Sequence, residues 1–100
     1  MEEKILRKLF LGFIQLHILR HGSKKPIYGV WLMDHLKEHG YNMSSGTIYP
    51  LLKNMCRDGL LSLEEKKVEG KIRKYYTTTD LGKIVLKKGE EKVSELSKNM

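Results

Sequence analysis

Hydroxyl and cationic side chains are concentrated in two stretches of the chain. The first stretch, residues 44–57, carries hydroxyls at Thr47 and Tyr49 and a cation at Lys53, and it contains no acidic residue. The second stretch is cationic and contains Lys66, Lys67, Lys71, Arg73 and Lys74. Hydroxyls bind phosphate oxygens and base edges of nucleic acid, and cations bind phosphates. We find no Ser-His-Asp arrangement, phosphate-binding loop or paired buried carboxylates in the sequence, so these residue types favour binding over catalysis.

The total charge agrees with a polyanionic partner. The chain has 19 Lys and Arg residues against 12 Asp and Glu residues, which gives a formal charge of +7 and a pI near 9.5. Each cation that meets a phosphate releases condensed counterions. A lysine-rich solvated surface would give the same total, so the charge is informative only where it lies on one face of a nucleic-acid-binding fold.

The four histidines are the residues that could bind a metal. His17 and His21 are four residues apart, as are His35 and His39, and such pairs share a helix face. No carboxylate or third ligand is obviously placed to complete either pair, so we expect no metal and no cofactor. A metal-responsive regulator is the weaker alternative, which tighter dimerisation or DNA binding on adding zinc would support. Cys56, the single cysteine, is expected to be a small core hydrophobe rather than a redox switch.

The elements that must position these side chains follow in the order helix, helix, helix, hairpin, helix. We predict helices over residues 2–20 and 26–39, a third from Ser44 or Ser45, and a last one over residues 80–97. Gly22, Gly40 and Gly59 are expected to end the first three helices. Pro50 is expected near the first turn of the third helix, because a deeper proline removes an internal hydrogen bond. Alternating residues after Leu60 and a turn at residues 69–70 indicate an antiparallel hairpin.

Two apolar stretches indicate contact with a second copy of the chain. A single domain of 100 residues buries only a modest core, and the first helix has a wider apolar stripe than that core requires. In the last helix, residues 86, 89, 93, 96 and 100 follow the spacing of a heptad seam. A helix-interior glycine costs about 1 kcal/mol, so at Gly89 we expect close approach of a partner helix; the alternative is a break there. The predicted dimer interface contains Leu6, Phe10, Phe13, Leu86, Gly89, Val93 and Leu96.

Short motifs spread over residues 27–82 resemble the PadR family of transcriptional regulators. They are Tyr28-Gly29, the heptapeptide GTIYPLL at residues 46–52, Asp58-Gly59-Leu60-Leu61, Arg73-Lys74-Tyr75-Tyr76, and Thr79 with Gly82. The resemblance implies an α+β, mostly helical fold, namely a winged helix-turn-helix with N-terminal and C-terminal dimerisation helices. It also implies a homodimeric repressor of transcription, often relieved by a small molecule. The chain departs from the family pattern at Trp31, usually glutamate, and at Thr78, usually leucine.

Carried over residue by residue, the resemblance implies a DNA-binding set. Its members are Tyr28, Ser44, Ser45, Thr47, Tyr49, Lys53, Lys66, Lys67, Lys71 and Arg73. We expect Thr47 and Tyr49 near bases and the lysines on the phosphate backbone. Ile27 and Trp31 are either a contact patch for a small hydrophobic or aromatic effector or ordinary packing.

These predictions divide the chain into a DNA-binding domain, residues 1–78, and a C-terminal dimerisation helix, residues 79–100. The apolar run at residues 5–19 contains charged and polar residues and is not followed by a cleavage site. We therefore expect no signal peptide, no membrane partner and a cytoplasmic location. The competing function is a winged-helix module that binds another protein, which predicts affinity for that partner and little for DNA.

Overall fold

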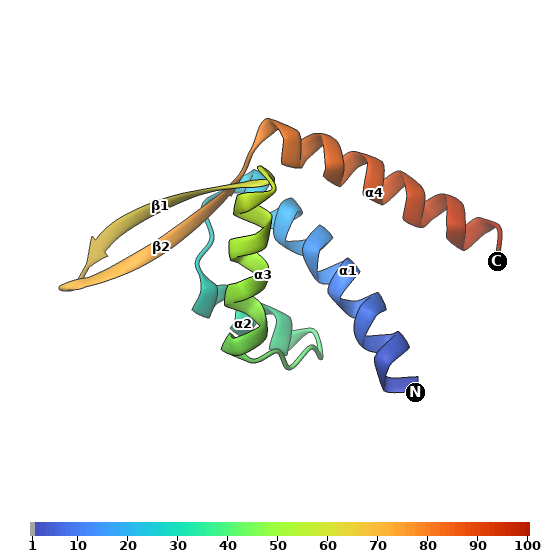
Figure 1. Ribbon diagram of the computed structural model, residues 1–100, viewed down its shortest axis with the longest axis horizontal. Coiled ribbons are helices and arrows are strands. Elements are labelled where there is room, and N and C mark those ends of the chain that lie inside the picture. Colours follow the sequence, from blue (N-terminus) through green and yellow to red (C-terminus); the bar gives the residue numbers. More distant parts are fainter. Residues whose placement is uncertain (1) are drawn as a thin grey trace.

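The structure is a computed structural model, and it describes residues 2–100. Its elements are α1 (Glu2–Lys24), α2 (Gly29–Glu38), α3 (Ser45–Arg57), β1 (Leu61–Val68), β2 (Lys71–Thr78) and α4 (Asp80–Lys98). Figure 1 shows α2 and α3 at the centre, the hairpin projecting to one side, and α1 and α4 extending to the other. The predicted α+β, mostly helical fold and its order of elements are confirmed.

Helix α3 begins at Ser45, as the sequence predicted, with Ser44 at the N-cap position. Ser44 has extended backbone angles, and its carbonyl accepts hydrogen bonds from the N–H groups of Thr47 (3.1 Å) and Ile48 (3.0 Å). The inward face of α3 is buried at Ile48, Leu52 and Met55. The prediction for Pro50 is wrong, because it is the sixth residue of α3 rather than a first-turn residue. The carbonyl of Gly46, which would otherwise pair with residue 50, belongs to an exposed residue and is left to bind solvent.

Helix α1 does not end at Gly22, as the sequence predicted, but continues to Lys24. Gly22 is buried inside the helix, and a Cβ there would lie 2.7 Å from Oγ1 of Thr78. The Thr78 hydroxyl donates a hydrogen bond of 2.8 Å to the carbonyl of Leu19. Gly22 therefore lets β2 approach α1 closely. Thr78, which replaces the leucine usual in the family, is a buried polar residue with a partner.

Helix α2 begins at Gly29, so the prediction of a start at Pro26 is also wrong. Ile27, two residues before Gly29, pairs with the sheet instead: its N–H donates to the carbonyl of Tyr76 (2.9 Å), and the N–H of Tyr76 donates to the carbonyl of Ile27 (2.7 Å). This bridge fixes the start of α2 against the hairpin. The predicted end of α2 is confirmed by Gly40, which adopts φ +87°.

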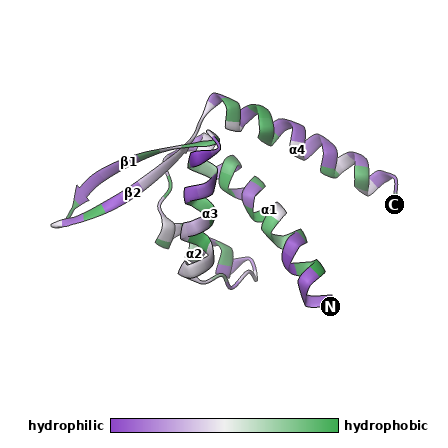
Figure 2. Cartoon of the chain, viewed as in Figure 1, coloured by the Kyte–Doolittle hydropathy of each residue, from purple (hydrophilic) through white to green (hydrophobic). Residues whose placement is uncertain are grey.

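The hairpin turns at Glu69 and Gly70, as predicted. Both residues have positive φ, 50° and 79°, as a two-residue type I′ turn requires. Antiparallel pairing places Val68 opposite Lys71 next to this turn. Residues 62–67 and 69–74 are exposed, and Figure 2 shows hydrophilic residues along most of this outer part. The outer hairpin is therefore held by its own ladder, and its side chains are exposed to solvent.

The core lies where α1, α2, α3, the first half of α4 and the inner end of the hairpin meet. It contains Ile14, Ile18, Leu19, Ile27, Leu32, Leu36, Ile48, Leu52, Met55, Leu61, Tyr76 and Leu86. Helix α4 runs without a break through Gly89, where a Cβ would lie 2.6 Å from Cδ2 of Leu16. The close approach predicted at Gly89 thus comes from α1 of the same chain. Among residues 2–100 we find no helix with the length and apolar character needed to cross a membrane.

Candidate nucleic-acid interface

The N-terminus of α3 presents hydroxyls and uncapped backbone donors. The Ser44 side chain does not cap the helix; its Oγ lies 3.4 Å from Oγ1 of Thr47. Ser44, Ser45 and Gly46 are exposed, and Thr47 is half-buried. The first N–H groups of a helix carry partial positive charge and bind anions such as phosphate when no side chain occupies them. This end of α3 can therefore bind a DNA backbone and also place hydroxyls beside bases.

Arg7 adds a cation that the sequence patterns did not indicate. Its guanidinium, carried by α1, donates a hydrogen bond of 3.4 Å to Oγ1 of Thr47. The sequence indicated no DNA-contacting residue in the first helix, and no local pattern links two residues 40 positions apart. The contact places a positive charge at the end of α3 where the predicted base-contacting residues begin.

Tyr49 lies across the start of α2. A Cβ on Gly29 would lie 2.6 Å from Cε1 and from the phenolic oxygen of Tyr49, so the ring rests against the bare backbone at that residue. The Tyr49 side chain is still 40% exposed. Gly29 thus permits the close approach of one aromatic residue of α3, and Tyr49 has both a packed face and a free face.

Tyr28 links the helices to the hairpin. The guanidinium of Arg73 lies 4.2 Å from the centre of the Tyr28 ring, and the ring of Tyr75 lies 5.6 Å from it. The ammonium of Lys66 lies 5.4 Å from the Tyr75 ring. Such cation–π contacts hold cations near aromatic faces without neutralising their charge. Arg73 and Lys66 can therefore be held in place beside α2 while they remain available to phosphates.

The predicted hairpin cations do not all share a face. Lys66 pairs directly with Arg73, whereas Lys67 pairs with Ile72. Side chains directly opposite each other in a ladder lie on the same face, and neighbours along a strand alternate. Lys66, Lys71 and Arg73 therefore lie on the face that meets Tyr28, and Lys67 lies on the other.

A groove separates α2 and α3 from the outer hairpin. It has a volume of about 510 Å³, and its lining includes Tyr28, Tyr49, Lys71 and Arg73. An adjoining hollow of about 530 Å³ includes Lys53 among its lining residues. The structure thus brings five of the ten predicted residues to two neighbouring hollows between α3 and the hairpin, while the other five line neither hollow.

The two residues considered for effector contact do not form one patch. Ile27 is 2% exposed and belongs to the core. Trp31 is half-buried on α2, where its ring stacks on His35 at 5.0 Å and an interplanar angle of 9°. The i, i+4 pairing of these two residues assumed a helix that began at Pro26, and α2 begins three residues later.

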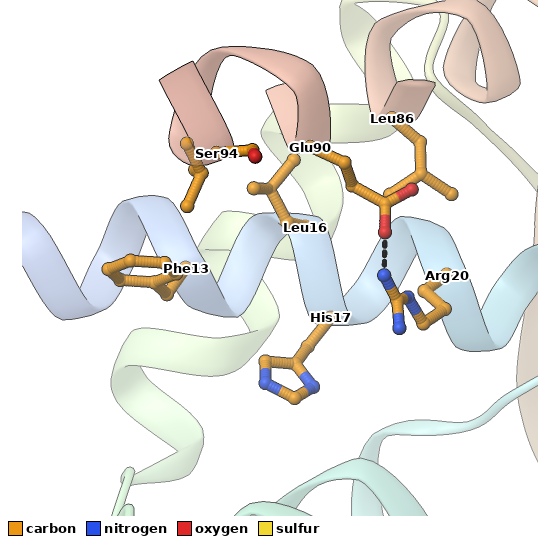
Figure 3. Close-up of a pocket in the computed structure, with 8 residues that line it drawn as sticks. Phe13, Leu16, His17, Arg20, Leu86, Glu90 and Ser94 are labelled. Carbon is orange, nitrogen blue, oxygen red and sulfur yellow. Dashed lines mark ion pairs between the residues drawn. The ribbon is translucent and has the colours of Figure 1, made fainter. Parts of the chain in front are cut away.

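The predicted dimer residues divide into exposed and packed groups. Leu6, Phe10, Phe13 and Leu96 are 37–55% exposed. Leu86 belongs to the chain's own core, and Gly89 packs on Leu16. Between α1 and α4 lies a groove of about 330 Å³. Figure 3 shows Arg20 and Glu90 turned towards each other across it, where they form an ion pair.

The two histidine pairs meet in the structure. One ring nitrogen from each of His17, His21 and His35 lies within 4.8 Å of the others. The expectation that no third ligand completes a pair is therefore wrong. The third ring, His35, comes from α2. The spacing within each pair cannot indicate a contact between two helices.

Comparison with known proteins agrees with this geometry. The model of the transcriptional regulator PadR-like family matches residues 16–88. The transcriptional regulator Rv3488 of Mycobacterium tuberculosis is 35% identical over 95 residues, which are 95% of this chain and 89% of that protein. A PadR family regulator from Eggerthella lenta has a similar structure, with a TM-score of 0.86 and 32% identity over 97% of this chain and 86% of its own. A PadR-like regulator from Bacillus cereus gives a TM-score of 0.76 and 33% identity over 96% and 91% of the two chains. The chain belongs to the PadR-like family of transcriptional regulators, which are DNA-binding proteins and not enzymes.

Proposed function

We propose that this regulator represses transcription as a homodimer that places α3 in the major groove of DNA and the outer hairpin beside it. The observation that supports this most is that α3 and the cationic face of the hairpin line the same groove, with Tyr28 between them. A helix of this kind enters the major groove with its N-terminal residues at the bases. The exposed hairpin cations then lie over the flanking backbone, where they release counterions.

Within this arrangement the side chains have different tasks. Thr47 and Tyr49 are placed for base edges, while Ser44 and Ser45 are placed for phosphates at the start of α3. Lys53 is exposed on the same helix and is placed for a phosphate further along. Lys66, Lys71 and Arg73 form the wing contact, and Lys67, on the other face of the hairpin, contributes long-range attraction.

The second subunit is proposed to cover the first half of α1. This half exposes large apolar side chains, namely Ile5, Leu6, Leu9, Phe10 and Phe13. Exposed apolar surface of this extent on one helix marks an interaction site. We assign residues 1–78 to DNA binding and residues 79–100 to dimerisation alongside α1. Leu6→Glu should shift the protein from dimer to monomer by light scattering, and the similarly exposed Leu63→Glu (45% against 48%) should not.

Relief of repression is proposed to use the groove between α1 and α4. Its volume of about 330 Å³ falls in the range of small-molecule sites, and Phe13, Leu16, Leu86 and Val93 contribute an apolar lining. A small hydrophobic or aromatic effector bound there would change the angle between the two helices that carry the dimer. The test is whether a panel of such compounds weakens DNA binding, and whether Phe13→Ala abolishes the response.

Selection of bound duplexes from random or genomic DNA at fixed salt tests the function as a whole. A dimeric regulator should enrich a two-fold symmetric site with half-sites about one helical turn apart, ~34–36 Å. A protein-interaction module would enrich no sequence, and that outcome would contradict the proposal. A reporter placed behind the selected site separates repression, which lowers its expression, from activation.

A further inference from the structure

All four histidines of the chain form one cluster between α1 and α2. The rings of His21 and His35 lie 4.5 Å apart, as do those of His35 and His39, and the rings of His17 and His21 are 6.1 Å apart. Two helices thus direct imidazoles towards the same space. The DNA-binding function described above makes no use of them.

We propose that His17, His21 and His35 form a binding site for a divalent transition metal of the zinc type. One ring nitrogen from each lies within 4.8 Å of the other two. Tetrahedral zinc with Zn–N bonds of about 2.0–2.1 Å places its nitrogen ligands ~3.4 Å apart. Small rotations of the three half-buried rings can bring their nitrogens from within 4.8 Å of one another to the distance that zinc requires. This is possible because His17 and His21 share one helix face and His35 faces them from α2. The fourth position is left for water.

The ligand chemistry selects the metal class. Imidazole nitrogen suits zinc, nickel, cobalt and copper, whereas magnesium and calcium require oxygen ligands. No carboxylate lies within the three-histidine set. Metals bind neutral imidazole, so protons compete with them. Burial, then the proximity of other histidines and of Arg20, lowers the pKa of His17, and burial and neighbouring histidines lower that of His21. Both shifts favour the neutral form of the ring.

His39 supports the site without joining it. Its Nδ1 lies 3.0 Å from the carbonyl of His35, so a hydrogen on Nδ1 donates to that carbonyl and orients the ring at the end of α2. Trp31 stacks on His35 and lies edge-on to His21, 5.5 Å away. Trp31 is the only tryptophan of the chain, so its fluorescence reports on this cluster alone.

The site joins two parts of the fold. His17 and His21 belong to α1, which exposes more large apolar side chains than any other element, and His35 belongs to α2, which packs against α3. A bound metal would tie the two helices together. The metal site is inferred from this geometry and not from DNA binding. An experiment can therefore disprove the metal site without disproving the proposed DNA-binding function, and the reverse.

The experiment uses the full chain carrying no added histidines, first stripped with a chelator. Zinc should bind at one ion per chain by calorimetry, change the Trp31 emission and raise the unfolding temperature. At a free zinc concentration 100 times its Kd, the folded-to-unfolded ratio should rise about 100-fold. Cobalt should give the visible absorption of a tetrahedral complex, and magnesium should have no effect.

Single variants test the ligand set. Loss of one-to-one zinc binding, and of the rise in unfolding temperature that zinc causes, is expected in each of the variants His17→Gln, His21→Gln and His35→Gln. The matched control His39→Gln should retain both. The unfolding temperature of each metal-free variant shows that it is folded. The proposal is overturned if zinc, nickel and cobalt leave both the fluorescence and the unfolding temperature of the native chain unchanged. It is also overturned if His21→Gln binds zinc as tightly as the native chain, or if His39→Gln loses binding as completely as His35→Gln.

Discussion

Replacing Gly29 with alanine should weaken DNA binding with little effect on stability. The new Cβ would lie 2.6 Å from Cε1 and from the phenolic oxygen of Tyr49, and 2.7 Å from Cζ. Carbon contacts normally lie at about 3.5–4.0 Å, so the ring must withdraw by ~1 Å. Because Tyr49 is 40% exposed, its ring can swing outward instead of forcing α2 and α3 apart.

Two opposing terms set the change in stability. Alanine within a helix gains roughly 0.5–1 kcal/mol over glycine, and overpacking a rigid site costs about 1–3 kcal/mol. Since the Tyr49 ring can move, we expect the free energy of unfolding to change by no more than ~1 kcal/mol. A displaced Tyr49 loses a base contact worth about 1–3 kcal/mol, so DNA affinity should fall roughly tenfold.

A double-mutant cycle tests this reasoning directly. Gly29→Ala, Tyr49→Ala and the double variant are compared by fluorescence anisotropy on the selected operator and by urea unfolding. In the Tyr49→Ala background the second substitution should leave DNA affinity unchanged and should stabilise the fold slightly. If Gly29→Ala weakened DNA binding equally in both backgrounds, the displacement of Tyr49 would not be the cause and the reasoning would be refuted.

Three further predictions concern the packing of α4 and the cysteine. Thr79→Ala should lower the free energy of unfolding by about 1–2 kcal/mol, because the Thr79 hydroxyl caps the first turn of α4 at 3.0 Å. The exposed Thr77→Ala should change it by less than about 0.5 kcal/mol, and equal losses in urea unfolding would contradict the cap. Gly89→Leu should displace Leu16 and lower the unfolding temperature at every protein concentration; a loss confined to low concentration would instead place Gly89 against a partner subunit. Burial raises the pKa of the Cys56 thiol, so iodoacetamide should alkylate the folded protein more slowly than the urea-unfolded chain, and equal rates would argue against this burial.

Local patterns predicted the elements that their own residues determine. The start of α3 follows from Ser44 and Ser45, residue types that favour the N-cap position, although the Ser44 side chain makes no capping hydrogen bond. The hairpin turn follows from Gly70, because a positive φ is required there. These signals lie within a few residues of the feature that they specify, so one sequence was sufficient.

Contacts between distant segments could not be predicted in the same way. Gly22 resembles a helix stop until Thr78, more than fifty positions later, is seen to pack on it. The same holds for Arg7 beside Thr47 and for Leu16 beside Gly89. In each case a tertiary contact overrides or adds to local propensity, and a single sequence carries no record of which distant residue provides it.

The family resemblance supplied part of the site that patterns alone did not. It indicated Tyr28, whose stacking with Arg73 joins α2 to the hairpin. The division of the hairpin cations into two faces depends on the register of the ladder, and Lys67 could be assigned only once that register was known.

The salt dependence of DNA affinity tests the proposed binding face most directly. For duplex DNA the slope of log K against log salt is about −0.9 per phosphate neutralised. The native protein should show a steep slope on its selected site, and Lys53→Ala should make the slope shallower by about 0.9 for each subunit bound, without lowering the unfolding temperature. An affinity independent of salt, or a slope unchanged in Lys53→Ala, would contradict the assignment of α3 and its cations to the DNA backbone.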